Sequence, residues 1–68
     1  MYNEDLYNKI ADEFPAVAVR NFCLMTSRMY NHMYEQCTED VCNEYDYQRQ
    51  WWLNKYIELS KSIKTEKL

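Results

Sequence analysis

The sequence predicts an all-α fold: a small three-helix bundle in which one short helix precedes a long antiparallel helical hairpin. The 68 residues contain no glycine and only one proline, so few positions suit the tight turns of β-hairpins or glycine-rich phosphate loops. Apolar side chains recur at spacings of three and four along most of the chain, which is the period of one helix face. Interruptions of this pattern divide the chain into three helical segments of a single domain, residues 1–68.

The first segment, residues 3–14, is expected to form a helix of about three turns. Asn3 can cap its start, and acidic residues follow in the first turn, where they favour the positive end of the helix dipole. Pro15 ends the helix, because the residue before a proline is pushed out of the α region. The expected apolar stripe consists of Leu6, Tyr7, Ile10 and Phe14.

The second segment, residues 16–36, has the pattern of a strongly amphipathic helix. Its polar side includes Arg20 and Arg28, and Leu24 is expected to be partly exposed there. Three methionines lie on the apolar arc. We expect them in the core, although methionine is also typical of adaptable helix-binding grooves. The arc consists of Ala18, Val19, Phe22, Met25, Thr26, Met29, Tyr30, Met33 and Cys37.

The third segment, residues 39–64, is the longest expected helix. Thr38 is a candidate cap, and one apolar stripe runs the length of the segment at spacings of three and four. Because this helix is longer than the second, part of it is expected to lie over the first helix or against another molecule. Its stripe consists of Val41, Tyr45, Gln48, Trp52, Tyr56, Leu59 and Ile63.

Two rings of the third helix do not fit this stripe. At roughly 100° per residue, Tyr47 and Trp51 fall on the opposite side as an i, i+4 pair. An exposed Tyr–Trp pair has the composition of a protein-binding hot spot. Two alternatives remain: Trp51 packs along the bundle edge over the first helix, or the helix breaks near residues 46–48. The predicted partner-binding residues are Tyr47, Trp51, Asn54, Lys55 and Glu58.

Arg49 lies inside the stripe, where an unpaired buried guanidinium would be costly. It is expected to reach Asp12 or Glu13, to stack on Trp52, or to contact an anionic ligand. In the last case Arg20, Arg28 and Arg49 are the candidate ligand-binding residues.

Charge and composition exclude several classes of protein. The formal net charge is −3, made of −6 over residues 1–48 (nine acids, three bases) and +3 over residues 49–68 (five bases, two acids). A binder of duplex nucleic acid usually has a basic face, so we do not expect one. No stretch approaches the ~18 apolar residues of a membrane span. A cytoplasmic location with reduced cysteines is expected, and a Cys37–Cys42 disulfide, although geometrically conceivable, is disfavoured in that compartment.

Catalytic and metal chemistry have little support in the sequence. Cys23 and Cys37 are separated by fourteen residues, about 21 Å along a helix, which is too far for one zinc ion. His32, the single histidine, has no Ser or Cys at helical neighbour spacing. We therefore expect no cofactor, no metal and no enzymatic activity.

The function predicted from these features is stoichiometric binding of another protein, as an inhibitor or regulatory subunit of the kind carried by phages or mobile elements. Hydrophobic residues make up 47% of the chain, with eleven aromatics, more than so small a core needs, so a homodimer is also expected. The alternative is a helical protein that binds or sequesters a nucleotide-type ligand by aromatic stacking and Arg or Lys contacts.

Overall fold

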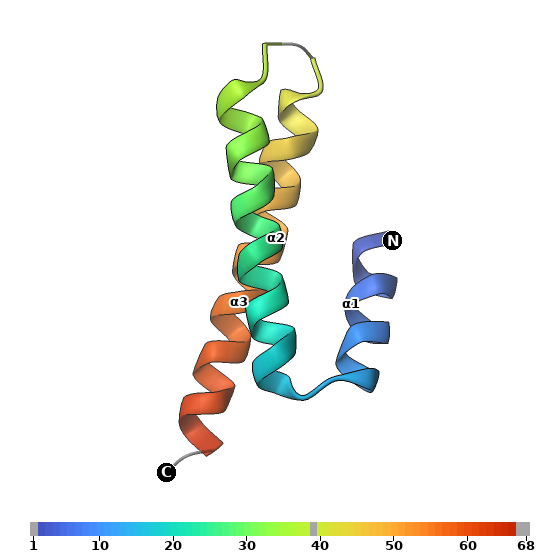
Figure 1. The fold of residues 1–68 in the computed structure, drawn as a ribbon, viewed down its shortest axis with the longest axis vertical. Coiled ribbons are helices and arrows are strands. Elements are labelled where there is room, and N and C mark those ends of the chain that lie inside the picture. The colour runs from blue at the N-terminus through green and yellow to red at the C-terminus, as the bar shows by residue number, and fades with distance from the viewer. Residues whose placement is uncertain (1, 39, 67–68) are drawn as a thin grey trace.

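A computed structural model describes the backbone of residues 2–38 and 40–66 and the side chains of residues 3–38 and 40–63. This part of the chain forms three helices, α1 (Tyr2–Glu13), α2 (Ala16–Gln36) and α3 (Cys42–Glu66), and no strand. The helices α2 and α3 form an antiparallel hairpin, and α1 lies beside it (Figure 1). The predicted all-α three-helix bundle is confirmed. Because α3 is continuous, the predicted alternative of a break near residues 46–48 is wrong.

The helix ends differ slightly from the expected ones. Asn3 lies inside α1 and is buried, and its Nδ2 donates a hydrogen bond to Gln48 Oε1 at 2.6 Å, so it joins α1 to α3 instead of capping. Pro15 is extended at the N-terminus of α2, and its carbonyl accepts from the Val19 N–H at 3.0 Å. Helix α3 begins three residues later than expected, because residues 40–41 form a turn.

The core of the hairpin is small. Val19, Cys23 and Trp52 are the buried hydrophobic residues of the described chain. Ser27 is also buried on this face of α2, and its Oγ donates a hydrogen bond to the backbone carbonyl of Arg49 at 2.9 Å. The edge of the Phe22 ring meets Trp52 with 5.6 Å between ring centroids. The Trp52 indole thus shares the core with the smaller side chains Val19 and Cys23 and also contacts the larger Phe22.

The buried face of α2 is rotated by about one residue, roughly 100°, from the predicted arc. The inner positions are Val19, Cys23 and Ser27, followed by the half-buried Tyr30 and Tyr34. Several residues predicted for the core are exposed instead, and the expected methionine core is wrong for Met25 and Met29, whereas Met33 is half-buried. Val19 and Cys23 leave room for Trp52 in the core, whereas a Phe or Met at either of these two buried positions would compete with it for volume. The exposed members of the predicted arc are Ala18, Phe22, Met25 and Met29.

The phase of α3 agrees better with its predicted stripe. Trp52 is buried, and five further stripe residues are half-buried, namely Tyr45, Gln48, Tyr56, Leu59 and Ile63. Val41 is the exception, because it lies in the turn before α3 and is 50% exposed.

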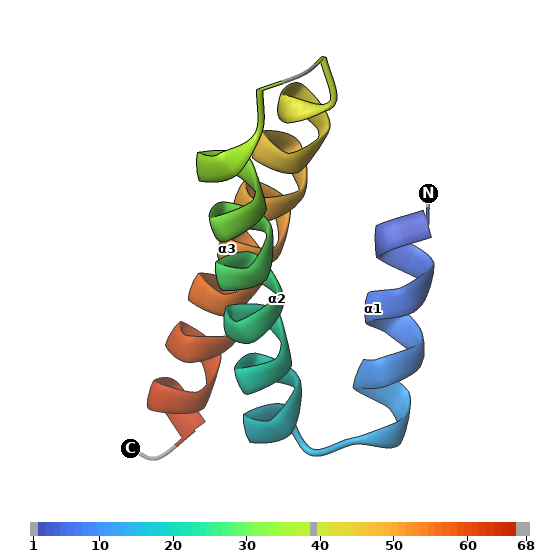
Figure 2. The same cartoon turned by 45° about the horizontal axis from the view of Figure 1, so that its top comes forward.

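Helix α1 contacts the hairpin through long side chains. Its Leu6, Tyr7 and Ile10 pack against the buried core. The Tyr7 ring meets Trp51 edge-on, with 6.1 Å between centroids. The ribbons of α1 and α2 stand apart except where they join (Figure 2), so α1 is held mainly by side chains.

The molecule is elongated, with extents of 45 × 22 × 14 Å and a Cα radius of gyration of 13.1 Å. A compact domain of this length has a radius of gyration of about 11 Å. The accessible surface is 5258 Å², roughly 650 Å² more than area–mass scaling predicts for a compact monomer of this mass. Among the described helices, none is long and apolar enough to cross a membrane.

Cys37 and Cys42 form a disulfide across the turn between α2 and α3, with their Cα atoms 5.6 Å apart. The sequence predicts three reduced cysteines and disfavours this bond. The structure differs, because two of the three cysteines are paired. The bond closes the tip of the hairpin. Cys23 is a buried thiol.

Candidate protein-binding surface

An apolar surface extends along α2 and the end of α1. The exposed hydrophobic residues here include Met25 (70% exposed), Phe14 (53%) and Met29 (51%). On α2 the exposed residues Ala18, Phe22, Met25 and Met29 recur at spacings of four, three and four, so they share one side of that helix. Phe14 lies in the link just before α2. We call this region the Phe–Met surface and define it by Ile10, Phe14, Ala18, Phe22, Met25 and Met29.

A pocket lies at one end of the Phe–Met surface, with a volume of about 340 Å³ and a lining of Ile10, Phe14, Ala18 and Phe22. Pro15 creates it, because the extended residue between the two helices places the end of α1 beside the start of α2. The small side chain of Ala18 leaves the space that the three larger residues surround. Since all four residues are apolar, the pocket suits an aliphatic or thioether side chain rather than an anion.

The predicted patch on α3 does not form one exposed surface. Tyr47 is 45% exposed, and Asn54 and Glu58 are exposed as well. Trp51 is half-buried and packs against the core, with its ring 4.8 Å from Trp52 between centroids. Trp51 is therefore not an exposed ring beside Tyr47, as the hot-spot interpretation of this pair expects.

Lys55, another member of that patch, is also partly covered by α1. Its Nζ lies 5.0 Å from the centroid of Tyr7 and 5.3 Å from that of Trp51, and 4.0 Å from Glu58 Oε1. Together with the Tyr7–Trp51 contact, this places Trp51 at the bundle edge under α1, as the edge-packing alternative described. Whether the exposed members bind a partner stays a prediction.

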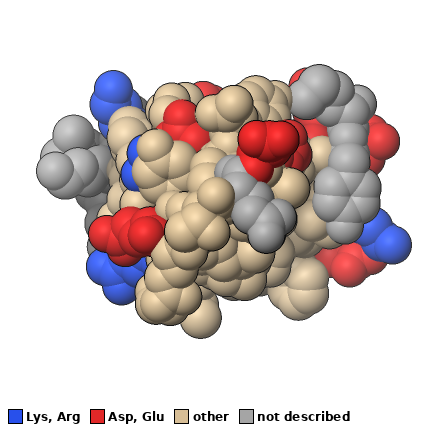
Figure 3. Space-filling view, turned by 90° about the horizontal axis from the view of Figure 1, so that it is seen from above, with Lys and Arg blue, Asp and Glu red and all other residues tan. Residues whose placement is uncertain are grey.

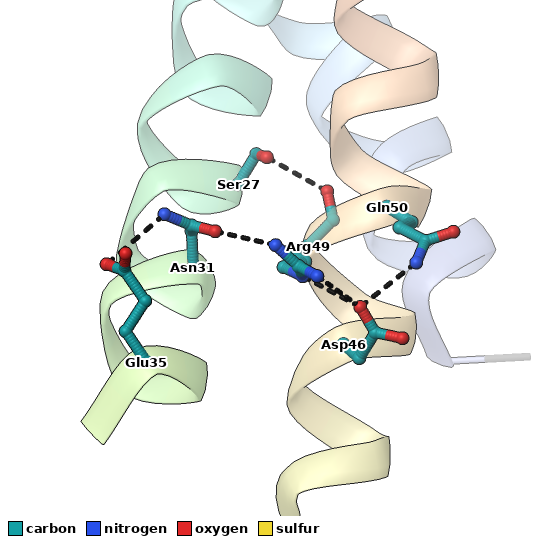
Figure 4. A network of polar contacts seen from close by, with 6 residues as sticks. All are labelled: Ser27, Asn31, Glu35, Asp46, Arg49 and Gln50. Atoms are coloured by element: carbon teal, nitrogen blue, oxygen red, sulfur yellow. Dashed lines mark hydrogen bonds and ion pairs between the residues drawn. The ribbon is translucent and has the colours of Figure 1, made fainter. Parts of the chain in front are cut away.

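Arg49 is held by neighbours on both long helices (Figure 4). Its guanidinium forms an ion pair with Asp46 at 2.7 Å, and its Nη1 donates to Asn31 Oδ1 at 2.7 Å. It also lies over the Tyr34 ring, 4.2 Å from the centroid. These partners differ from the expected Asp12, Glu13 and Trp52.

The Arg49 network affects the protonation of its acid. Hydrogen bonds from Arg49 and then from Gln50 hold the pKa of the Asp46 carboxyl below its ordinary value. The network therefore needs an ionised Asp46. Because Arg49 pairs with Asp46 on α3 and with Asn31 on α2, fewer of its N–H donors are available to a ligand.

The other two candidate arginines are not gathered with Arg49 into a site. Arg28 is exposed and lies eight residues from Arg20, about 12 Å along α2. Arg20 is half-buried, and its Nε is buried without a hydrogen-bond partner. Neither pocket described in this chain is lined by an arginine.

The hairpin tip carries the second pocket, about 410 Å³ in volume, and its surface is mixed in polarity. Viewed from this end, acidic and basic side chains are interspersed among uncharged ones (Figure 3). Among the described side chains on that face, the basic ones form no continuous patch of the kind that binds nucleic acid. The tip pocket is lined by Met33, Gln36, Cys37, Thr38, Val41 and Tyr45.

The residues considered for catalysis or metal binding are dispersed. Burial raises the pKa of the Cys23 thiol to about 11, partly offset by Lys55, so this thiol is neutral near pH 7 and a poor nucleophile. Burial also raises the pKa of Tyr7. His32 is exposed. Within residues 3–38 and 40–63, no group of three or more His, Cys, Asp or Glu side chains could hold a metal ion.

A comparison with protein-family models gives no match to the chain, and neither the curated proteins nor the solved structures contain a match. The Phe–Met surface thus rests on the geometry of this chain alone. Sequence reasoning missed it because it assigned the methionines to the core. The available signal was the recurrence of smaller residues every four positions at Val19, Cys23 and Ser27, directly beside the methionine stripe.

Proposed function

We propose that this protein is a stoichiometric protein-binding module that contacts its partner through the Phe–Met surface. The partner would place apolar side chains over Met25 and Met29 and one side chain into the pocket beside Ala18. An inhibitory or regulatory role, of the kind carried by phages or mobile elements, fits a module that binds without turning over a substrate.

The balance between buried and exposed hydrophobic residues carries this proposal. Among the described residues, three hydrophobic side chains are buried, whereas nine large ones are exposed. Single exposed apolar residues are common on proteins, but a contiguous group is typical of an interaction site. Four of the nine belong to the Phe–Met surface. Methionine and phenylalanine are also enriched in the cores of protein interfaces.

The lining of the pocket favours a protein partner over a nucleotide-type ligand. A nucleotide brings phosphate groups that need Arg, Lys or backbone N–H donors. Ile10, Phe14, Ala18 and Phe22 offer none of these from their side chains, and Arg49 already pairs with Asp46. No specific contact favours the nucleotide alternative.

A cytoplasmic location, which was expected from the sequence, stays part of the proposal. The Cys37–Cys42 disulfide weighs against it, because disulfides persist in oxidising compartments and are rare in the cytosol. In a reducing cytoplasm these two cysteines would be thiols. The Phe–Met surface includes neither of them.

Affinity capture from the natural host, with matched variants, tests the binding surface. The double variant Met25→Ser/Met29→Ser removes two exposed thioethers. It should lower the affinity for the captured partner by roughly thirtyfold or more, as loss of a hot spot does. Its melting temperature should stay close to that of the parent chain, because both side chains are largely outside the core.

Tyr47→Ser is the matched control, since Tyr47 is about as exposed but lies on the predicted α3 patch. We expect it to capture the same partner with unchanged affinity. The reverse result, loss of the partner with Tyr47→Ser and retention with the methionine variant, would contradict the proposal. It would support instead a contact built on Tyr47, Asn54 and Glu58.

A further inference from the structure

We infer that a second copy of this chain occupies the Phe–Met surface in the free protein, with the two α2 helices antiparallel across a twofold axis. This inference rests on the proposed function, because it names a partner for the same surface. An outside partner would then compete with the second copy. Three observations support a self-complementary contact.

The first observation is the symmetry of the apolar positions on α2. Five residues on this side of the helix lie at positions 18, 22, 25, 29 and 33. In an antiparallel pair centred beside Met25, Phe22 lies level with Met29 of the other copy, and Ala18 lies level with Met33. Met25 lies opposite itself within half a residue. Isologous dimers require such self-complementarity, because each residue contact occurs twice.

The second observation is the match between small and large side chains in this register. The pocket has Ala18 as its smallest lining residue. Met33 is half-buried and lies four residues after the exposed Met29, so the two follow each other on one side of α2. Each copy would place its Met33 and Met29 over the pocket of the other. Methionine is the side chain best able to adapt to such an irregular space.

The third observation is the area that the chain leaves exposed. Its surface of 5258 Å² exceeds the scaling value for a compact monomer by roughly 650 Å². A standard interface buries about 800 Å² on each partner. Burial of an interface of that size would therefore reduce the exposed surface of each copy to about the value that the scaling predicts for a compact monomer.

The charges do not oppose this pairing. None of the five positions is charged, so the centre of the contact brings no like charges together. Arg28 lies about 100° from Met29 on the helix and is exposed, so it stays at the side of the contact in solvent. The net charge of −3 per copy produces only weak long-range repulsion at physiological salt.

Exchanging the small residue Ala18 with the large residue Met33 tests two things: whether a second copy binds this surface, and whether the two α2 helices pair in the antiparallel register. Sedimentation velocity over a range of concentrations measures the dimer dissociation constant. Ala18→Met alone should weaken the dimer roughly tenfold or more, because it fills the pocket in both copies. Met33→Ala alone should weaken it by a similar factor, because it removes the side chain that fills the pocket. The double variant Ala18→Met/Met33→Ala should recover the parent affinity to within about threefold.

A crosslinking measurement provides a second test that does not depend on whether the Ala18 and Met33 variants fold. With Cys23 buried and Cys37 paired with Cys42, a short bismaleimide should join two Met25→Cys chains through their new thiols. Ile57→Cys, whose parent residue is 41% exposed on α3, is the matched control and should react without forming crosslinked dimers. More crosslinking at position 57 than at position 25 would overturn the inference.

The outcomes separate the failure of this inference from that of the proposed function. A chain that stays monomeric up to about 1 mM overturns the second copy as occupant, yet capture of an outside partner that depends on Met25 and Met29 would still support protein binding. A dimer whose single variants are additive in the double variant overturns the antiparallel register and with it the inference. Recovery in the double variant, together with crosslinking at position 25, supports it.

Discussion

Over residues 19–29, the two sides of α2 differ in the size of their side chains. The inner side places Val19, Cys23 and Ser27 against α3, and all three are buried. The outer side carries Met25 and Met29, which are larger and more apolar than Cys or Ser, yet are 70% and 51% exposed. The helix therefore does not bury its most hydrophobic side.

Packing against α3, and not hydrophobicity alone, therefore determines which side of α2 is buried. Trp52 is the largest fully buried side chain of the chain that the structure describes, and it needs space. Residues with small side chains at every fourth position provide that space. A monomer built this way keeps its larger apolar residues outside, where another chain can cover them.

The largest expected effect comes from removing the residue that defines the inner side. Trp52→Ala should lower the free energy of unfolding by about 3–5 kcal/mol. A chain of this length has a total stability of roughly 3–10 kcal/mol, so the variant should lose a large part of it. Urea denaturation followed by far-ultraviolet circular dichroism measures the change.

Met25→Ala is the matched control on the outer side. Because Met25 is 70% exposed, its truncation in the monomer should change the free energy of unfolding by less than about 0.5 kcal/mol. Measurements at the lowest practical protein concentration separate this monomer value from any effect of self-association. If the two variants lost equal amounts of free energy of unfolding, the inner and outer sides of α2 would contribute equally to stability, which would contradict the difference described above.

Much of the fold was predictable from local patterns. The absence of glycine, the single Pro15 and the helix-period stripes predict three helices, and these depend only on nearby residues. The stripe of α3 was also predicted well, because Trp52, Tyr56 and Leu59 are apolar and share the side that is buried. The hydrophobicity pattern predicted the buried side of a helix correctly where that side was also the most apolar one.

The candidate surface was harder to predict, because it depends on how two helices fit together. On α2 the apolar arc was wide enough to allow several rotations, and hydrophobicity selected the methionines. The actual rotation is set by the volume of Trp52 and by the Ser27 hydrogen bond to Arg49. The position of Trp51 similarly depends on Tyr7 of α1, a contact that no local pattern contains.

An intermediate effect is expected at the hairpin tip, which keeps the inner side of α2 aligned with α3. The Cys37–Cys42 disulfide closes a loop of six residues between the helices. Loss of loop-closure entropy in the unfolded chain should make this bond worth about 2 kcal/mol. Reduction with a phosphine should therefore lower the urea midpoint, as measured by circular dichroism with and without the reductant.

The double variant Cys37→Ser/Cys42→Ser provides the control for this prediction. Its urea midpoint should match that of the reduced parent chain and should not respond to the phosphine. If reduction leaves the parent midpoint unchanged, the disulfide does not stabilise the hairpin. In that case the inner contacts around Cys23 and Trp52 alone would hold α2 in register.

The smallest expected effect concerns the polar end of the inner contact, where Asp46 pairs with Arg49. The pKa of Asp46 is lowered from its ordinary value of 3.8, so its ionised form is favoured in the folded chain. Its contribution to stability is complete above that ordinary value and is lost as the pH falls through the lower folded value. Asp46→Asn should therefore reduce the free energy of unfolding at pH 7, and the difference from the parent should shrink as the pH falls below 3.8.

Urea titrations of parent and variant between pH 7 and about pH 3 measure this difference directly, and other carboxylates cancel because both chains contain them. Asp12→Asn on α1 is the matched control, since Asp12 is exposed and lies outside the Arg49 network. A difference for Asp46→Asn that is constant with pH would mean that the pair acts only through geometry, by holding Arg49 over Tyr34. A difference that disappears at low pH shows that the charge of Asp46 helps to fix the inner side of α2 on α3, and so leaves Met25 and Met29 facing outward.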